Sequence, residues 1–157
     1  SFEETFQLPY ATSELSSAHL KDLIQDIRKV ISKKKIDTVF SPYIYDAHSD
    51  HYITASAASS ACKTFRSPTI KNLLFYETLS ETNFNFSGRN NAFRPNTYID
   101  ISNAIKKKIS ISKLYTNEFQ KHPFPRSDDS IRSLALLRGS ESGVKNAEAF
   151  MATFIKF

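Results

Sequence analysis

Residues 46–51 read Asp-Ala-His-Ser-Asp-His and bring the imidazoles of His48 and His51 next to the carboxylates of Asp46 and Asp50. Imidazole and carboxylate groups bind zinc and exchange protons near neutral pH. An apolar run precedes the motif and predicts a strand, and an alanine-rich segment follows it and predicts a helix. Open α/β sheets hold their ligands where strands end. The motif therefore indicates metal-assisted hydrolysis.

Strand-like and helix-like segments alternate along the chain. Runs of apolar, β-branched and aromatic residues predict strands at residues 5–8, 38–40, 70–76 and 97–101. Apolar periodicity and capping residues predict helices at residues 16–34, 50–63, 102–118 and 128–138, the last ending at Gly139. Alternation of this kind favours an α/β fold, with a Rossmann-like and mostly parallel sheet flanked by helices. We expect residues 1–157 to form one domain.

Composition is that of an ordinary globular domain, with 157 residues, 40% hydrophobic and 24% charged. No apolar run approaches the roughly 20 residues of a membrane-spanning helix, and no signal peptide is recognisable. The single cysteine, Cys62, excludes an internal disulfide and fits a reducing compartment. We therefore expect a cytoplasmic protein.

The formal net charge of +5 comes largely from two lysine runs, at residues 33–35 and 106–108. Both runs lie on expected helices, where they favour solvated faces or the negative end of the helix dipole. A nucleic-acid site would need basic residues interleaved with aromatic ones on one surface, and no such pattern is present. We expect no nucleic-acid partner and keep that class as the weakest alternative.

Several separated motifs resemble the PIG-L/LmbE-like zinc-dependent de-N-acetylases, over nearly the whole chain and in the family's order. Residues 46–51 resemble the His-x-Asp-His motif of that family. Residues 74–80 resemble its strand that ends in Tyr-Glu, and residues 93–101 resemble its Phe-x-Pro-Asn segment that leads to Asp-Ile. Residues 138–144 and 147–150 resemble its closing motifs.

This resemblance implies a role for each polar residue of the motif. His51 would be a zinc ligand, although another divalent metal would also suit it. His48 would donate a proton or hydrogen bond to the oxyanion, and Asp50 would hold one imidazole in its working tautomer. Asp46 would line the same pocket. General chemistry supports these roles. A hydrolytic zinc needs about three protein ligands, of which His51 would be one, and the oxyanion needs a hydrogen-bond donor, which His48 would supply.

Two further residues are weaker candidates for substrate binding. Glu77 would touch substrate, or it would end a strand and pair with Lys71 or Arg89. Arg94 would grip a sugar hydroxyl or phosphate, or it would be a solvated loop arginine. The two histidines also have a simpler reading, as helix N-terminal residues bonded to the neighbouring carboxylates without metal.

The family's first motif, an Ala-His-Pro-Asp-Asp-Glu-like run, is missing from the 157 residues. In the family it supplies the other two zinc ligands and the general base. Three explanations stay open: the motif lies upstream of the chain, another chain supplies it, or the protein is inactive. The first is favoured because Ser1 is not an initiator methionine. We therefore expect residues 1–157 to be the C-terminal part of such a domain, with a missing N-terminal segment or a homo-oligomer completing the sheet.

The implied function is metal-dependent removal of an acetyl group from an N-acetylglucosamine-type sugar or glycoconjugate. The substrate would be an N-acetylated amino sugar, and zinc would be the cofactor. The alternative is a catalytically inactive α/β module that binds sugar or serves as a scaffold.

Overall fold

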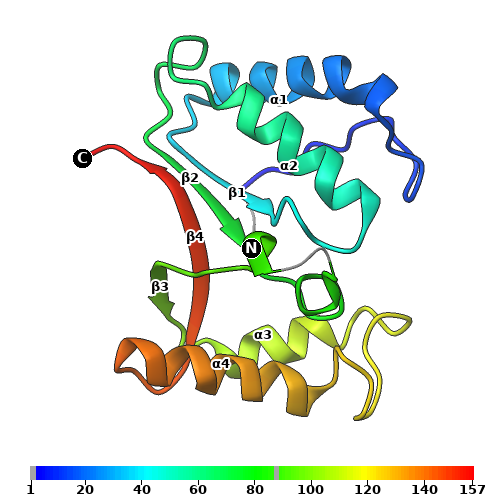
Figure 1. The fold of residues 1–157 in the computed structure, drawn as a ribbon, viewed down its shortest axis with the longest axis vertical. Coiled ribbons are helices and arrows are strands. Elements are labelled where there is room, and N and C mark those ends of the chain that lie inside the picture. The colour runs from blue at the N-terminus through cyan, green and yellow to red at the C-terminus, as the bar shows by residue number, and fades with distance from the viewer. Residues whose placement is uncertain (1–2, 87–88) are drawn as a thin grey trace.

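The computed structural model describes residues 3–86 and 89–157, which form a four-stranded sheet and two pairs of helices (Figure 1). The strands are β1 (Thr38–Pro42), β2 (Asn72–Tyr76), β3 (Thr97–Asp100) and β4 (Ala147–Ile155). The helices are α1 (Leu20–Lys34), α2 (Ser49–Ala61), α3 (Ile105–Ser112) and α4 (Asp128–Ser142). Short 3-10 turns cover Ser17–His19, Thr82–Phe84 and Arg89–Asn91. The α/β class is confirmed.

The sheet has the order β1-β2-β4-β3 and is mixed, so the expected mostly parallel arrangement is wrong. Among the described residues, only β1 and β2 run parallel, and β4 is antiparallel to both β2 and β3. A parallel pair needs a long crossover, which α2 supplies between β1 and β2. β4 follows α4 after a turn of four residues, and its direction is opposite to that of its neighbours β2 and β3. This strand is not among those expected from the sequence.

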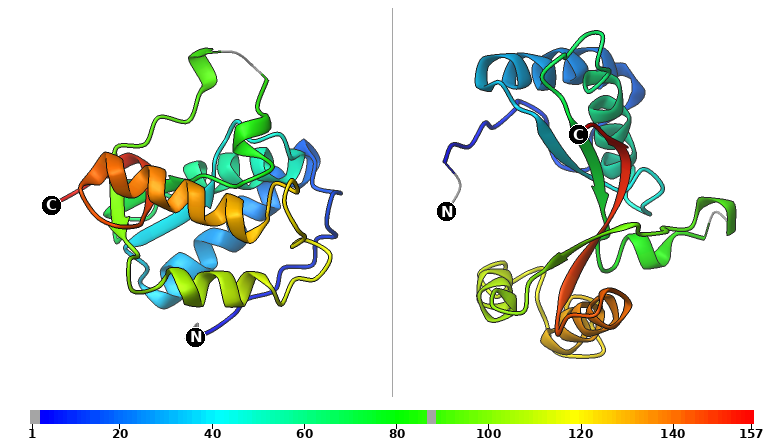
Figure 2. Two further views of the ribbon diagram at one scale, coloured as in Figure 1. Left: turned by 90° about the horizontal axis from the view of Figure 1, so that it is seen from below. Right: turned by 90° about the vertical axis from the view of Figure 1, so that its left-hand side faces the viewer.

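The helices α1 and α2 pack on each other near β1 and β2, at the opposite end of the molecule from α3 and α4 (Figure 2). The apolar stripe of α1 is confirmed. Leu23 and Ile31 are buried and belong to two separate hydrophobic clusters, and Ile24 and Ile27 pack against both clusters. Small residues of α2 such as Ala57, which is fully buried, allow the close approach of α1. These contacts fix the start of α2, where the candidate motif lies.

The second pair of helices covers β3 and β4 and departs from the expected bounds at two points. The helix expected over residues 102–118 is shorter, because α3 ends at Ser112. The hydroxyls of Ser110 and Ser112 donate to the carbonyls of Lys107 and Lys108, and such local bonds compete with further helix growth. Leu114, which falls within the expected helix, lies beyond the observed one and is exposed.

The last helix extends past Gly139, which was expected to end it. Gly139 lies inside α4, where an added Cβ atom would be 2.6 Å from the carbonyl oxygen of Val144. Glycine therefore allows the turn after the helix to fold back against it. The helix ends instead at Gly143, which has the left-handed backbone conformation typical of a C-terminal cap, with φ 76°.

The strand expected at residues 5–8 is also wrong, because this segment has irregular structure and pairs with no strand. Leu8 and Tyr10 instead pack against the cluster of Leu23, Ile53 and Ala57. A short β-prone run followed by Pro9 forms no strand without a neighbouring edge to supply its hydrogen bonds.

Cys62 is buried at the end of α2 and forms no disulfide. Burial raises the pKa of its thiol to about 11, so the neutral thiol is the stable form near neutral pH. The residue therefore acts as a small apolar core residue and not as a nucleophile.

None of the helices in residues 3–86 and 89–157 has the length and apolar character needed to cross a bilayer. Within the same residues β1 pairs with β2 alone and forms one edge of the sheet, while β3 forms the other. The idea that a further segment or a second copy completes the sheet at β1 stays a prediction.

Candidate functional site

The candidate motif lies between the C-terminal end of β1 and the start of α2, as the sequence predicts. A turn closed by a hydrogen bond from the Asp46 amide to the Tyr43 carbonyl (3.1 Å) leads the chain into the helix. His48 is the N-cap of α2, and His51 lies one turn later. Their ring centroids are 5.4 Å apart and the rings are tilted by 31°, so the two imidazoles lie side by side.

The hydrogen bond of His48 determines its neutral tautomer. Its Nδ1 accepts from the backbone amide of Asp50 at 3.1 Å, in the manner of an N-cap side chain. An accepting nitrogen carries no hydrogen, so the ring hydrogen of neutral His48 must be on Nε2. His48 therefore offers an N–H donor on the side of the ring away from the helix.

His51 has the opposite arrangement. Its Nδ1 lies 2.7 Å from Oδ2 of Asp46, and a carboxylate can only accept, so Nδ1 is the donor. In the neutral ring Nε2 then carries a lone pair and no hydrogen. This is the form in which an imidazole binds a metal, and a carboxylate partner of this kind fixes the orientation of the ring. The two neighbouring histidines are thus held in different tautomers.

The loop after β2 holds Asp46 in place. The hydroxyl of Thr82 donates to Oδ1 of Asp46 at 2.6 Å, and Thr82 itself accepts from the amide of Thr78 at 2.7 Å. The amide of Ala47 donates to the carbonyl of Glu81 at 3.2 Å and joins the same two loops. The side chain of Asp46 is completely buried, whereas that of His51 is 24% exposed. A buried carboxylate thus supports a partly accessible imidazole.

Asp50, expected to orient an imidazole through its carboxylate, makes a different contact. Its Oδ2 accepts from the backbone amide of Ser13 at 2.7 Å, which ties the N-terminal segment to α2. Its Oδ1 is buried and has no hydrogen-bond partner among the described residues. Asp50 bonds to His48 through its backbone amide instead, and the carboxylate contact to an imidazole comes from Asp46.

Two tyrosines border the motif. Burial is the main cause that raises the pKa of Tyr76 at the end of β2, and the charge of Asp46 adds to it. Burial also raises the pKa of Tyr43, with contributions from Tyr45 and Asp46, while the positive charge of Arg94 lowers it. The amide of Arg94 donates to the sulfur of Met151 at 3.2 Å. Arg94 is exposed, and it lies close enough to Tyr43 to affect its ionisation.

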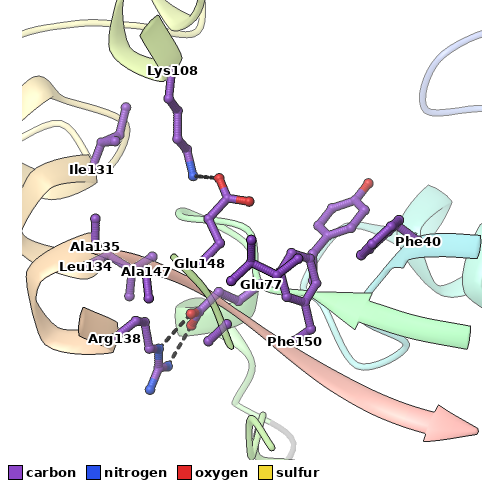
Figure 3. Close-up of a pocket in the computed structure, with 13 residues that line it drawn as sticks. Phe40, Glu77, Lys108, Ile131, Leu134, Ala135, Arg138, Ala147, Glu148 and Phe150 are labelled. Atoms are coloured by element: carbon purple, nitrogen blue, oxygen red, sulfur yellow. Dashed lines mark hydrogen bonds and ion pairs between the residues drawn. The ribbon is translucent and has the colours of Figure 1, made fainter. Parts of the chain in front are cut away.

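Glu77 is paired with an arginine that the sequence did not suggest. Both of its carboxylate oxygens accept from Arg138 of α4 at 2.7 Å, and both side chains are largely buried (Figure 3). These bonds raise the pKa of the Arg138 guanidinium, so the pair stays charged. Lys71, considered above as a partner, lies near Asp37 instead, and the side chain of Arg89 is outside the described part of the chain. Glu77 is held by a structural contact between β2 and α4.

The Glu77–Arg138 pair lines a pocket of about 560 Å³ between the sheet and the helices α3 and α4 (Figure 3). A second pair, Lys108–Glu148 at 2.6 Å, lies in the same pocket. Apolar side chains such as Phe40 form most of the remaining wall. The pocket does not include His48 or His51, so it is separate from the motif.

The residues present supply part of a zinc site. His51 fits a zinc ligand, because its Nδ1 is bonded to Asp46 and its Nε2 is free of an intramolecular hydrogen bond among the described contacts. His48 in its neutral form has a hydrogen on Nε2 and fits a donor better than a ligand. Within residues 3–86 and 89–157, no group of three metal-binding side chains comes together. A complete site would need donors beyond these.

Comparison with known proteins supports the fold. No family model and no curated protein matches the sequence. Among solved structures, the fold is similar to that of N,N'-diacetylchitobiose deacetylase from Pyrococcus horikoshii, with a TM-score of 0.62 and 20% identity over 92% of this chain. It is also similar to the conserved protein TT1542 from Thermus thermophilus, with a TM-score of 0.72 and 18% identity over 94% of this chain.

The chain spans 55% of the deacetylase and 64% of TT1542. At these identities the similarity shows a shared fold, including the α/β sheet with its flanking helices.

The sequence pattern singles out the two histidines and both carboxylates, but nothing in it points to Thr82, Thr78 or Ser13, which the structure places in contact with one another or with these residues. Thr82 is 36 residues from Asp46 in the sequence, and Ser13 is 37 residues from Asp50. A threonine in a polar loop is an ordinary loop residue, and only the fold brings it to the motif.

Proposed function

We propose that this protein is a zinc-dependent hydrolase that removes the acetyl group from an N-acetylglucosamine-type sugar or glycoconjugate. The observation that carries the proposal is the opposite tautomers of His48 and His51, which offer one N–H donor and one free nitrogen lone pair next to each other. The fold, which is similar to that of a chitobiose deacetylase, is consistent with this activity.

Each residue of the motif has a role in this reaction. His51 would bind the metal through Nε2, supported by Asp46. Bound zinc would supply a water of lowered pKa and polarise the acetyl carbonyl. His48 would donate its Nε2 hydrogen to the carbonyl oxygen as negative charge develops there. The positive end of the α2 dipole, at whose N-cap His48 lies, favours the same charge.

The other candidates have smaller roles in the proposal. Asp50 would position His48 through its backbone amide and would not act through its carboxylate. Arg94 is exposed at the start of the segment before β3 and remains a proposed contact for a sugar hydroxyl. Glu77 is committed to Arg138, so we propose that it shapes the fold near substrate and makes no direct contact.

Release of acetate tests this function. We expect the full-length protein to release acetate from N-acetylglucosamine or N,N'-diacetylchitobiose, to lose this activity after treatment with a zinc chelator, and to regain it when zinc is added. Acetate can be measured enzymatically and free amine by fluorescence labelling.

The alternative, a sugar-binding or scaffolding module, is favoured by one observation: no three-donor group comes together among the described residues. It predicts the opposite outcome in the same assay. Sugar binding by calorimetry, without acetate release and without bound zinc after purification in zinc-replete medium, would favour that module and reject the hydrolase.

A further inference from the structure

Thr82 lies in the loop after β2 and is connected to His51 by hydrogen bonds through Asp46. Its Oγ1 accepts the amide hydrogen of Thr78 at 2.7 Å, which leaves the hydroxyl hydrogen directed to Oδ1 of Asp46 at 2.6 Å. The other oxygen of Asp46 accepts from Nδ1 of His51 at 2.7 Å. A continuous chain of hydrogen bonds therefore runs from a backbone amide to the imidazole.

Each oxygen of Asp46 has one side-chain partner, and this fixes the rotation of the carboxylate. The side chain is fully buried, so no solvent can replace a lost partner. Without the Thr82 hydroxyl, Oδ1 would be a buried oxygen with no donor, and the carboxylate would gain by rotating or shifting toward another one. Such a movement would weaken the bond that keeps the hydrogen of His51 on Nδ1.

We propose that Thr82 is a positioning residue: through Asp46 it holds His51 in the tautomer whose Nε2 is free to bind zinc. The zinc part of this inference rests on the proposed function, while the tautomer part does not. Partners in the outer shell of a metal site commonly change metal affinity by about 10–100-fold. Asp46 is such a partner, because it bonds directly to His51. The hydroxyl of Thr82 bonds to Asp46 and acts on His51 through it.

A set of threonine variants in one loop tests the inference. Thr82→Val removes the hydroxyl and keeps the shape of the side chain, whereas Thr82→Ser keeps the hydroxyl. Thr78→Val is a matched control, because the Thr78 hydroxyl is buried without a hydrogen-bond partner among the described residues and the Thr78 amide is retained. If the valine variant does not fold, Thr82→Ala removes the same hydroxyl with less bulk.

Two readouts are needed. Long-range proton–nitrogen NMR spectra of the metal-free protein report the tautomer of each histidine, and competition with a chelating dye gives the zinc dissociation constant. In the wild type, Thr82→Ser and Thr78→Val, we expect His51 to carry its hydrogen on Nδ1. In Thr82→Val we expect a mixture of His51 tautomers, an unchanged His48, and zinc binding weaker by about 10–100-fold.

The outcomes separate this inference from the proposed function. If Thr82→Val keeps the wild-type tautomer of His51 and the wild-type zinc affinity, Thr82 is not a positioning residue. If no variant of the full-length protein binds zinc, including the wild type, the proposed function fails, and the NMR spectra still decide whether Thr82 sets the tautomer. Equal losses in Thr82→Val and Thr78→Val would show a general effect on the loop and would also reject the inference.

Discussion

Replacing His51 with alanine should remove bound zinc and reduce acetate release by more than about 100-fold, the upper end for losing only a supporting partner of a ligand. The reason is that Nδ1 of His51 bonds to Asp46, so Nε2 of the neutral ring has a lone pair that could bind zinc. His48→Ala should act differently. It should keep the zinc and lower kcat by about 10²–10³-fold, as expected for loss of an oxyanion donor.

Metal content by atomic emission and kinetics of acetate release measure these two effects separately. His122→Ala is a suitable control, since it removes an exposed imidazole from the turn before α4. If His48→Ala lost the zinc and His51→Ala kept it, the roles assigned from the two tautomers would be reversed. Retention of activity in both variants would remove the histidine pair from the mechanism.

Replacing Arg138 with alanine should lower the free energy of unfolding by about 3–5 kcal/mol, because it leaves the carboxylate of Glu77 buried without its cation. The pair is bidentate, with side chains 15% and 12% exposed, and it joins β2 to α4. Denaturation in urea, followed by circular dichroism, measures the loss. The double variant Glu77→Leu with Arg138→Met should recover most of it, since no buried charge remains.

The pocket supplies its own control for this prediction. Lys108 and Glu148 form an ion pair in the same pocket with side chains 41% and 37% exposed. Lys108→Ala should therefore cost no more than about 1 kcal/mol, as is usual for exposed pairs. Equal effects of Arg138→Ala and Lys108→Ala would contradict the idea that burial makes the Glu77–Arg138 pair important.

The parts of the fold that depend on local pattern could be predicted from the sequence. The stripe of α1 and the small residues of α2 indicate both helices close to their observed bounds, and β1, β2 and β3 follow from short apolar runs. The errors come from effects beyond the local pattern. β4 pairs antiparallel between β2 and β3, and nothing in its own residues specifies that direction. The segment at residues 5–8 has the composition of a strand but no strand partner.

In the candidate site, too, the local motif could be predicted from the sequence, whereas the contacts of each side chain could not. The motif itself and its place between a strand and a helix were predicted, and Asp46 was expected to lie beside the histidines, where it bonds to His51. The sequence could not show that Asp46, and not Asp50, contacts an imidazole through its carboxylate. Both residues are near enough to both histidines along the chain for either carboxylate to contact either ring. Because His48 is the N-cap of α2, its Nδ1 accepts from the backbone amide of Asp50, and the carboxylate that bonds to His51 is that of Asp46.

The central claim is that a metal binds to Nε2 of His51 while Nε2 of His48 stays a donor. Anomalous diffraction at the zinc absorption edge, from crystals of the zinc-loaded full-length protein, tests this claim most directly. We predict an anomalous peak about 2.0–2.1 Å from Nε2 of His51, the usual length of a zinc–nitrogen bond, and none at that distance from His48. The absence of a peak at His51, or a peak bonded to His48 alone, would contradict the account.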